Sequence, residues 1–329
     1  MDGQKQYIEN YNRMINGIIE SQTGEYRELL KGYLNHLRDA FSISSKYSYM
    51  CAVKRFLESV KKTASEIRYE DYTEFLNDIS DKSSTYKIMN HAALKNFSEY
   101  LMASHRNSEN AMQYVKVPKT SKSKEKEKKE KRLNNVLHED EIKQYIRNVE
   151  CGCGSDRAKA RQEQMKERDR CIIEIFLKTG MRCSALYRIN TSDINLEERT
   201  IKVLEKRDKL RTFYITDKTR ICIEEWMIRR LEILNGKEED ALFISNQKRR
   251  LDSSCIRDIT HKYGVGIKNI TPHKLRATFG TQLLEKTEGD LDKVRIAMGH
   301  NSISTTELYV RRDETKVGKE IADLMEDII

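Results

Sequence analysis

Five residues in four short stretches of this chain carry side chains suited to chemistry at a phosphodiester. Arg182 stands in T-G-M-R, His273 and Arg276 in H-K-L-R, His300 in M-G-H, and Tyr309 in T-T-E-L-Y. Guanidinium groups bind the non-bridging oxygens of a phosphate, imidazoles handle protons near neutral pH, and a phenol oxygen is a nucleophile. These groups suffice for transesterification at a phosphodiester, so the pattern calls for no metal ion and no other cofactor.

The local sequence predicts how these side chains are positioned. A run of apolar residues that ends at Leu177 predicts a long helix, and Gly180 stops it just before Arg182. Pro272 is suited to the first position of another helix, with Thr271 as its N-cap. His273 and Arg276 then lie three residues apart on one helical face. Both are expected to point into one site.

These stretches resemble the tyrosine recombinase family, which includes the phage integrases and the Xer-like site-specific recombinases. The family signature is Arg, Lys, His-x-x-Arg, His or Trp, and then Tyr. T-G-M-R-C-S-A-L resembles its first arginine box, P-H-K-L-R-A-T-F its second, and M-G-H-N-S-I-S-T-T-E-L-Y its third. The resemblance covers about 136–329, and in the N-terminal part it concerns architecture alone.

The resemblance implies a role for each residue. Tyr309 attacks the scissile phosphate, leaving a 3′-phosphotyrosyl bond and a free 5′-hydroxyl. Arg182 and Arg276 bind the non-bridging oxygens, where negative charge gathers in the transition state. His273 handles protons, and His300 donates a hydrogen bond to the phosphate.

Two positions depart from the family pattern. Lys206 matches the lysine of the family's β-hairpin, the general acid toward the leaving 5′-oxygen. The family usually has Gly-Lys-Gly there, whereas this chain has Glu205-Lys206-Arg207, so Lys209 is an alternative. Three residues after Arg182 the family often places an acid that holds the arginine. Ala185 occupies that position, so another group must orient Arg182.

The predicted fold is mainly α with a small β-sheet: a four-helix, SAM-like core-binding domain followed by an α+β tyrosine-recombinase catalytic domain. Apolar residues at helical spacing predict the helices, and Ile201 with Val203, then Phe213 with Ile215, predict a β-hairpin. The expected division is an N-terminal helical extension at 1–24, a DNA-binding helical domain at 25–115, a basic linker at 116–135, and a catalytic domain at 136–329.

The linker has a composition of its own. Residues 116–132 hold nine basic residues and three acids with almost nothing apolar, so they cannot pack a core. They are either a solvated tether or a basic strap along DNA phosphates, and counterion release favours the strap.

Bulk composition agrees with a nucleic-acid partner. The 329 residues carry a formal net charge of +9, which favours a polyanion. The seven cysteines follow no disulfide or zinc spacing, so we expect free thiols in a reducing compartment. Cys151-Gly152-Cys153 alone is weak evidence for a metal. Without an apolar signal or membrane segment, a cytoplasmic protein is expected, associated with the nucleoid in a prokaryote.

The expected partners follow from the family. They are double-stranded DNA recombination sites and three further copies of the chain, forming a homo-tetramer on DNA, with scope for an accessory DNA-bending or directionality factor. An apolar stripe in the tail suits a helix exchanged between protomers or packed on its own domain. Its residues are Ile321, Leu324, Met325, Ile328 and Ile329.

Three functions therefore stand open. The favoured one is a site-specific recombinase acting through a Holliday junction, for integration or excision of a mobile element or for resolution. A type IB topoisomerase-like enzyme shares the chemistry but relaxes one duplex as a monomer. A non-catalytic DNA-binding protein derived from a recombinase predicts decay of the signature, which this sequence does not show. The sequence does not reveal the recombination site.

Overall fold

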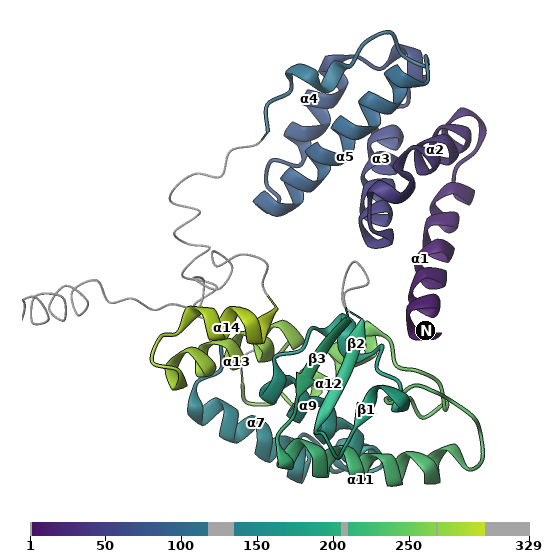
Figure 1. Ribbon diagram of the computed structural model, residues 1–329. Helices are drawn as coiled ribbons and strands as arrows, with labels where there is room; N and C mark the ends of the chain where they lie inside the picture. Colours follow the sequence, from purple (N-terminus) through teal and green to yellow (C-terminus); the bar gives the residue numbers. More distant parts are fainter. Residues whose placement is uncertain (1, 118–134, 205–209, 268, 300–329) are drawn as a thin grey trace, which may run out of the picture. The chain divides into compact units, whose positions relative to one another are not determined.

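The structure is a computed structural model that describes residues 2–117, 135–204, 210–267 and 269–299. The chain divides into two compact units, Met1–Glu125 and Lys126–Ile329. Each unit is described below by itself (Figure 1).

The N-terminal unit is helical throughout. Its helices are α1 (Asp2–Glu20), α2 (Gly24–Leu37), α3 (Ile43–Val60), α4 (Tyr69–Asp78) and α5 (Ser84–Ala103). Serine side chains cap two of them, because Ser42 Oγ accepts from Ser45 N at 3.3 Å and Ser83 Oγ accepts from Tyr86 N at 3.3 Å. The four helices predicted after residue 25 are confirmed.

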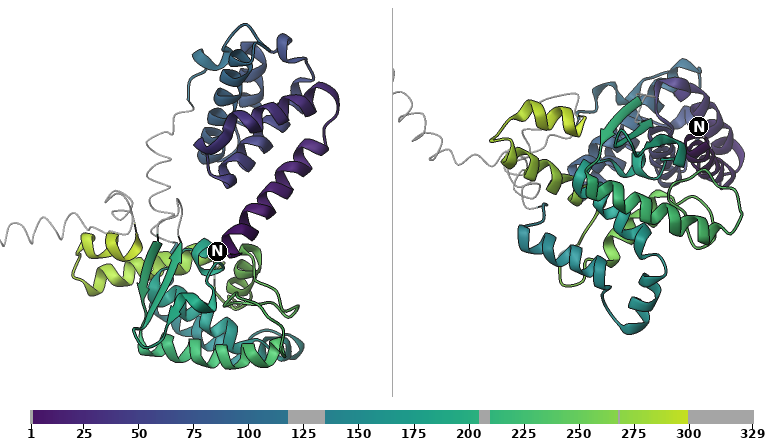
Figure 2. Two further views of the ribbon diagram at one scale, coloured as in Figure 1. Left: turned by 45° about the vertical axis from the view of Figure 1, so that its right-hand side comes forward. Right: turned by 60° about the horizontal axis from the view of Figure 1, so that its bottom comes forward.

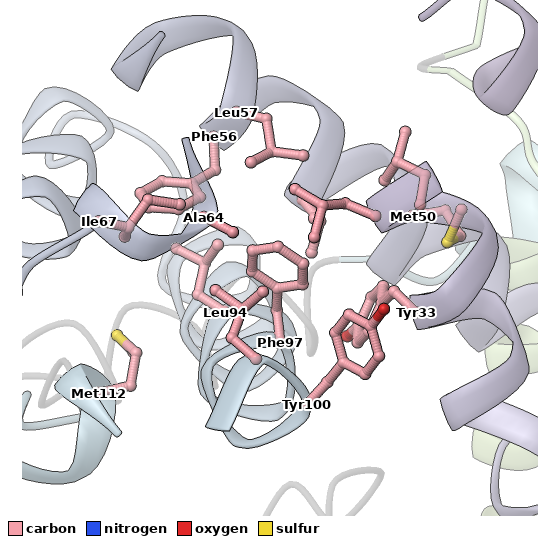
Figure 3. Close-up of a cluster of buried hydrophobic side chains, with 14 of the residues drawn as sticks. Tyr33, Met50, Phe56, Leu57, Ala64, Ile67, Leu94, Phe97, Tyr100 and Met112 are labelled. Atoms are coloured by element: carbon pink, nitrogen blue, oxygen red, sulfur yellow. The ribbon is translucent and has the colours of Figure 1, made fainter. Parts of the chain in front are cut away.

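The core of this unit combines aromatic rings with aliphatic side chains (Figure 3). Phe56 stacks on Tyr72 with ring centroids 4.5 Å apart, and Tyr33 meets Phe97 edge to face at 5.2 Å. The buried Tyr33 hydroxyl donates to the Ala93 carbonyl at 3.1 Å, so its polar end is satisfied. The helical extension predicted at 1–24 forms α1, and its residues Ile15, Ile18 and Ile19 join the same core.

The C-terminal unit mixes helices with a small sheet, as predicted (Figure 2). Its helices are α7 (Glu139–Cys151), α8 (Asp156–Glu163), α9 (Lys166–Thr179), α10 (Cys183–Leu186), α11 (Asp217–Leu234), α12 (Ser253–Lys262), α13 (Pro272–Lys286) and α14 (Leu291–Met298). The helix predicted to include the apolar run up to Leu177 and to stop at Gly180 is α9, and α8 is a separate helix before it. Met165 interrupts the pattern between them in a non-helical conformation.

The sheet has three antiparallel strands in the order β1-β2-β3. β2 (Thr200–Leu204) and β3 (Leu210–Tyr214) form the predicted hairpin, with Val203 opposite Arg211. β1 (Ile194–Asn195) was not predicted. It has only two residues, too few to show an alternating pattern.

Helix α9 lies at the centre of this unit. It packs against α11 and α13, and residues Cys171–Leu177 are all buried. A helix that is apolar on most of its surface must be covered on every side. The position of its C-terminal end, where T-G-M-R begins, is therefore fixed by packing on several elements.

A buried charged cluster ties α9 to α12. The Asp169 carboxylate is fully buried and accepts from Arg168 Nε at 2.9 Å and from the Tyr263 hydroxyl at 2.9 Å, and it pairs with Lys262. Burial and the neighbouring Asp169 charge raise the pKa of Tyr263, which keeps this phenol a donor. The Arg168 guanidinium also donates to the Ile244 carbonyl at 2.9 Å, so the cluster reaches the loop after α11.

We predict that Asp169→Ala lowers the free energy of unfolding by about 3–5 kcal/mol, because it leaves buried cationic donors without their carboxylate. Tyr263→Phe removes one donor and should cost about 1 kcal/mol. Urea denaturation measures both. Asp258→Ala, which changes an exposed carboxylate on α12, is the matched control and should stay within ~0.5 kcal/mol of the parent. Equal effects of Asp169→Ala and Asp258→Ala would contradict the role of the cluster.

Candidate active site

The first arginine stretch forms a sharp turn between two helices. Gly180 caps α9 with a left-handed backbone (φ +58°), and its N–H donates to the Phe176 carbonyl at 3.1 Å. The Thr179 hydroxyl donates to the Ile175 carbonyl at 2.6 Å and accepts from Met181 N at 3.2 Å. Arg182 then stands at the N-cap of α10. In T-G-M-R, the glycine thus ends α9 and the arginine two residues later is held at the start of α10.

The second arginine lies on α13. As predicted, Pro272 opens this helix and the Thr271 hydroxyl caps it, accepting from Lys274 N at 3.1 Å. Arg276 is 6% exposed. Its Nη1 donates to the Gly180 carbonyl, so a residue of the second stretch binds the backbone of the first.

Both arginines also reach the C-terminal end of α14. Arg276 Nη2 donates to the Met298 carbonyl at 2.5 Å, and Arg182 Nη2 donates to the Gly299 carbonyl at 3.1 Å. The last carbonyls of a helix lack partners within the helix and carry the negative end of its dipole. They are therefore good acceptors for cations. Two guanidiniums from different elements are held side by side on consecutive carbonyls, and this charge would suit an anion.

The Gly299 bond answers the question raised by Ala185. Ala185 is buried in α10, where the family often has an acid. A main-chain carbonyl is one group that orients Arg182 in this chain. Because the Gly299 carbonyl belongs to the M-G-H stretch, the orientation of Arg182 depends on the position of that stretch.

The structure brings three of the six predicted site residues into one region. His273 is exposed on the first turn of α13, three residues before Arg276. Lys206, its alternative Lys209, His300 and Tyr309 lie outside the described residues, as does the apolar stripe of the tail. Helices α13 and α14 lie next to each other (Figures 1 and 2), and α14 ends at Met298, two residues before His300.

The sequence reasoning missed one arginine. Arg211 of β3 also donates to carbonyls of the last turn of α14, from Nη2 to Ile296 O at 3.0 Å and to Ala297 O at 2.5 Å. Strand alternation places Arg211 on the same face as the buried Phe213. That alternation was the signal in the sequence that this arginine points inward.

The cysteines are free thiols, as predicted. The Cys153 thiol is buried and donates to the Lys262 carbonyl at 3.3 Å, and burial raises its pKa. Within 2–117, 135–204, 210–267 and 269–299, no three His, Cys, Asp or Glu side chains gather closely enough to bind a metal ion. In those same ranges no helix has the length and apolar character needed to cross a membrane.

Comparison with known proteins extends the picture beyond the described region. Residues 135–316 match the model of the phage integrase family. The tyrosine recombinase XerC of Psychromonas ingrahamii is 30% identical over 231 residues, which cover 69% of this chain and 70% of that protein.

Solved structures share the fold. The XerH site-specific recombinase, bound to its difH substrate in a pre-cleavage complex, aligns with a TM-score of 0.64 and 22% identity over 96% of this chain and 94% of that one. A lambda integrase dimer bound to a COC′ core site aligns with a TM-score of 0.61 and 16% identity, over 87% of this chain and 95% of that one. Both similarities concern the fold, which matches the mainly helical architecture with its small sheet.

We predict that Gly180→Ala destabilises the C-terminal unit by at least about 2 kcal/mol. An alanine there adopts a left-handed backbone, and its Cβ would lie 2.3 Å from the Phe279 ring. The matched control is Gly236→Ala, whose φ is +80° but whose Cβ would meet nothing within 4 Å. Thermal unfolding of the two variants separates backbone strain from the ring contact. Equal losses would show that Phe279 moves aside without cost.

We also predict that alkylation distinguishes two cysteines. Burial raises the pKa of Cys183 to about 11, so at pH 8 only about one thiol in a thousand is the reactive thiolate. Cys151 is exposed. Iodoacetamide followed by peptide mass spectrometry should label Cys151 first, and the rate at Cys183 should rise about tenfold per pH unit below pH 11. Equal rates at pH 8 would contradict the partial burial of Cys183.

Proposed function

The chain belongs to the phage integrase family, and from this premise we propose which bond it attacks and which residues attack it. As a tyrosine recombinase, it cuts and rejoins DNA at specific sites. One observation carries the proposal for its active site: Arg182 and Arg276 meet at consecutive carbonyls of Met298 and Gly299.

Tyr309 is the nucleophile in this proposal. Its phenol oxygen forms a bond to the scissile phosphorus while the bond from phosphorus to the 5′-oxygen breaks, giving a 3′-phosphotyrosyl bond and a 5′-hydroxyl. A phenol has a pKa of ~10, so its proton must be accepted as it attacks. We assign that proton to His273, and the proton delivered to the leaving oxygen to Lys206. Attack by a 5′-hydroxyl of the other duplex reverses these steps.

The two arginines stabilise the transition state. The phosphorus gathers negative charge on its non-bridging oxygens, and a guanidinium positioned beforehand offsets this charge without reorganising during the reaction. A guanidinium has five N–H groups in a fixed plane, so one that is positioned on a carbonyl can also bind phosphate. His300, one residue beyond the carbonyl that Arg182 contacts, supplies a further hydrogen bond to the phosphate.

The wider reaction follows from covalent storage of the bond energy. Because the phosphotyrosyl bond retains the energy of the phosphodiester, strand exchange needs no nucleotide. We propose sequential exchange through a Holliday junction by four protomers, with the tail stripe docking between neighbours and the basic linker lying along DNA phosphates. We also propose a role on a mobile element or in resolution, with an accessory DNA-bending or directionality factor as an optional partner.

We predict that the chain forms a Tyr309-dependent covalent adduct with DNA. The substrates are nicked duplexes that carry inverted repeats from the DNA flanking the coding sequence. The nick lets the short 5′-fragment diffuse away, so the adduct accumulates and is seen on a denaturing gel. Tyr309→Phe should abolish it, because the phenyl ring keeps its shape but has no oxygen to attack.

The matched control is Tyr114→Phe, which removes an exposed phenol from the N-terminal unit and should leave the adduct intact. Tight, salt-sensitive binding without an adduct on any duplex would favour a non-catalytic DNA-binding protein. Relaxation of supercoiled DNA that carries no paired sites would favour a type IB topoisomerase-like enzyme. An adduct retained in Tyr309→Phe would show that another residue is the nucleophile.

A further inference from the structure

Three arginines converge on the last turn of α14, and only two of them belong to the catalytic signature. Arg276 comes from α13, Arg182 from the start of α10, and Arg211 from β3. Together they donate to four consecutive carbonyls, those of residues 296 to 299. Arg211, which is outside the signature, therefore binds the same helix end as the two signature arginines.

The contacts of Arg211 are those of a structural support. Its Nη2 atom binds the carbonyls of Ile296 and Ala297, and its guanidinium lies over the Phe213 ring at 4.4 Å. A guanidinium over an aromatic face gains cation–π stabilisation and loses orientational freedom. Arg211 thus joins the sheet to the helix end through a side chain that is held on both sides.

The carbonyls that Arg211 binds directly precede those that position the other two arginines. Arg211 binds residues 296 and 297, and the next two carbonyls, of Met298 and Gly299, position Arg276 and Arg182. The end of a helix frays readily because its last carbonyls lack helical partners. If this turn shifts, the acceptors that orient both phosphate-binding arginines shift with it.

Gly299 shows how closely the arginine approaches the chain. Its backbone is left-handed (φ +60°), which favours glycine, and a Cβ built there would lie 2.0 Å from Nη1 of Arg211 and 2.7 Å from Cζ. Two features therefore favour glycine at position 299 of M-G-H. One is the left-handed backbone, and the other is the guanidinium of Arg211, which occupies the space that a side chain would take.

We propose that Arg211 is a positioning residue for the recombination reaction: it fixes the last turn of α14 so that Arg276 and Arg182 are held ready for the scissile phosphate. The proposal rests on the function proposed above, and it gives Arg211 no contact with DNA. It predicts that loss of Arg211 lowers the rate of adduct formation most when the scissile phosphate carries its full negative charge. A loss of protein stability alone would lower the rate equally on any substrate.

The test compares two substrates in single-turnover adduct formation. One nicked duplex has the ordinary scissile phosphate, and in the other a methyl group replaces one non-bridging oxygen, so that less negative charge needs arginine. Arg211→Met should lower the rate about 10- to 100-fold on the ordinary duplex, as misplaced catalytic groups do. On the methylphosphonate the deficit relative to the parent should shrink to about threefold or less, because the guanidiniums contribute less there.

Two further variants complete the comparison. Arg211→Lys keeps the charge and one donor to the carbonyls, so it should recover part of the rate on the ordinary duplex. Arg229→Met removes a partly exposed arginine from α11 that pairs with Glu232 at 2.7 Å, and it should react as the parent does. A parental rate in Arg211→Met, or an equal deficit on both substrates, would overturn the proposal.

A second measurement needs no DNA. Gly299→Ala should lower the Tm more in the parent than in the Arg211→Met background, where the guanidinium no longer occupies the space of the new methyl group. Additive losses would overturn the placement of Arg211. If the parent forms no adduct while this coupling is present, the proposed function fails and the support of α14 stands. If the parent forms the adduct and the coupling is absent, the proposed function stands and the support of α14 by Arg211 fails.

Discussion

The end of helix α14 has more hydrogen-bond acceptors than the helix itself can satisfy, and three arginines of the C-terminal unit are organised around that excess. Carbonyls of its last turn attract guanidinium groups through ordinary hydrogen bonds and through the helix dipole. Arg182, Arg211 and Arg276 approach from a turn, a strand and a helix that are far apart in sequence. The three guanidinium groups carry like charges and repel one another, and the neighbouring carbonyls of one helix end hold them close together.

This arrangement links the stretches that a sequence signature lists separately. Arg276 binds the Gly180 carbonyl of the first stretch and the Met298 carbonyl of the third, and Arg182 binds Gly299. A displacement of any one stretch therefore reaches the other two. Such mutual dependence suits a reaction whose transition state must meet two guanidiniums at fixed positions.

The rest of the C-terminal unit serves to fix where these stretches begin. Helix α9 is buried on nearly all sides, so its C-terminal stop at Gly180 has little freedom, and Asp169 anchors the same helix to α12 through a buried charged cluster. A buried carboxylate is costly unless its partners surround it, which makes this cluster specific to one packing of the two helices. In the N-terminal unit a hydrophobic core that includes the stacked rings of Phe56 and Tyr72 joins the five helices, and the buried Asp71 carboxylate there accepts from Lys62 Nζ at 2.7 Å.

The sequence by itself determined the elements and the kind of chemistry. Helical periodicity located α2 to α5, strand alternation located β2 and β3, and the cap residues Thr271 and Pro272 located the start of α13. These features are local, so neighbouring residues encode them. The family followed from short motifs for the same reason, and the comparisons bear it out.

Only the tertiary structure decided what orients the arginines. No local pattern says that Arg211 reaches residues 296 and 297, or that a main-chain carbonyl orients Arg182 where Ala185 stands in place of an acid. Main-chain carbonyls are identical in every residue, so a sequence cannot mark which of them will be acceptors. That choice depends on where α14 ends in space relative to β3, α10 and α13, and this is settled by packing between residues that are 22 to 117 positions apart in the chain.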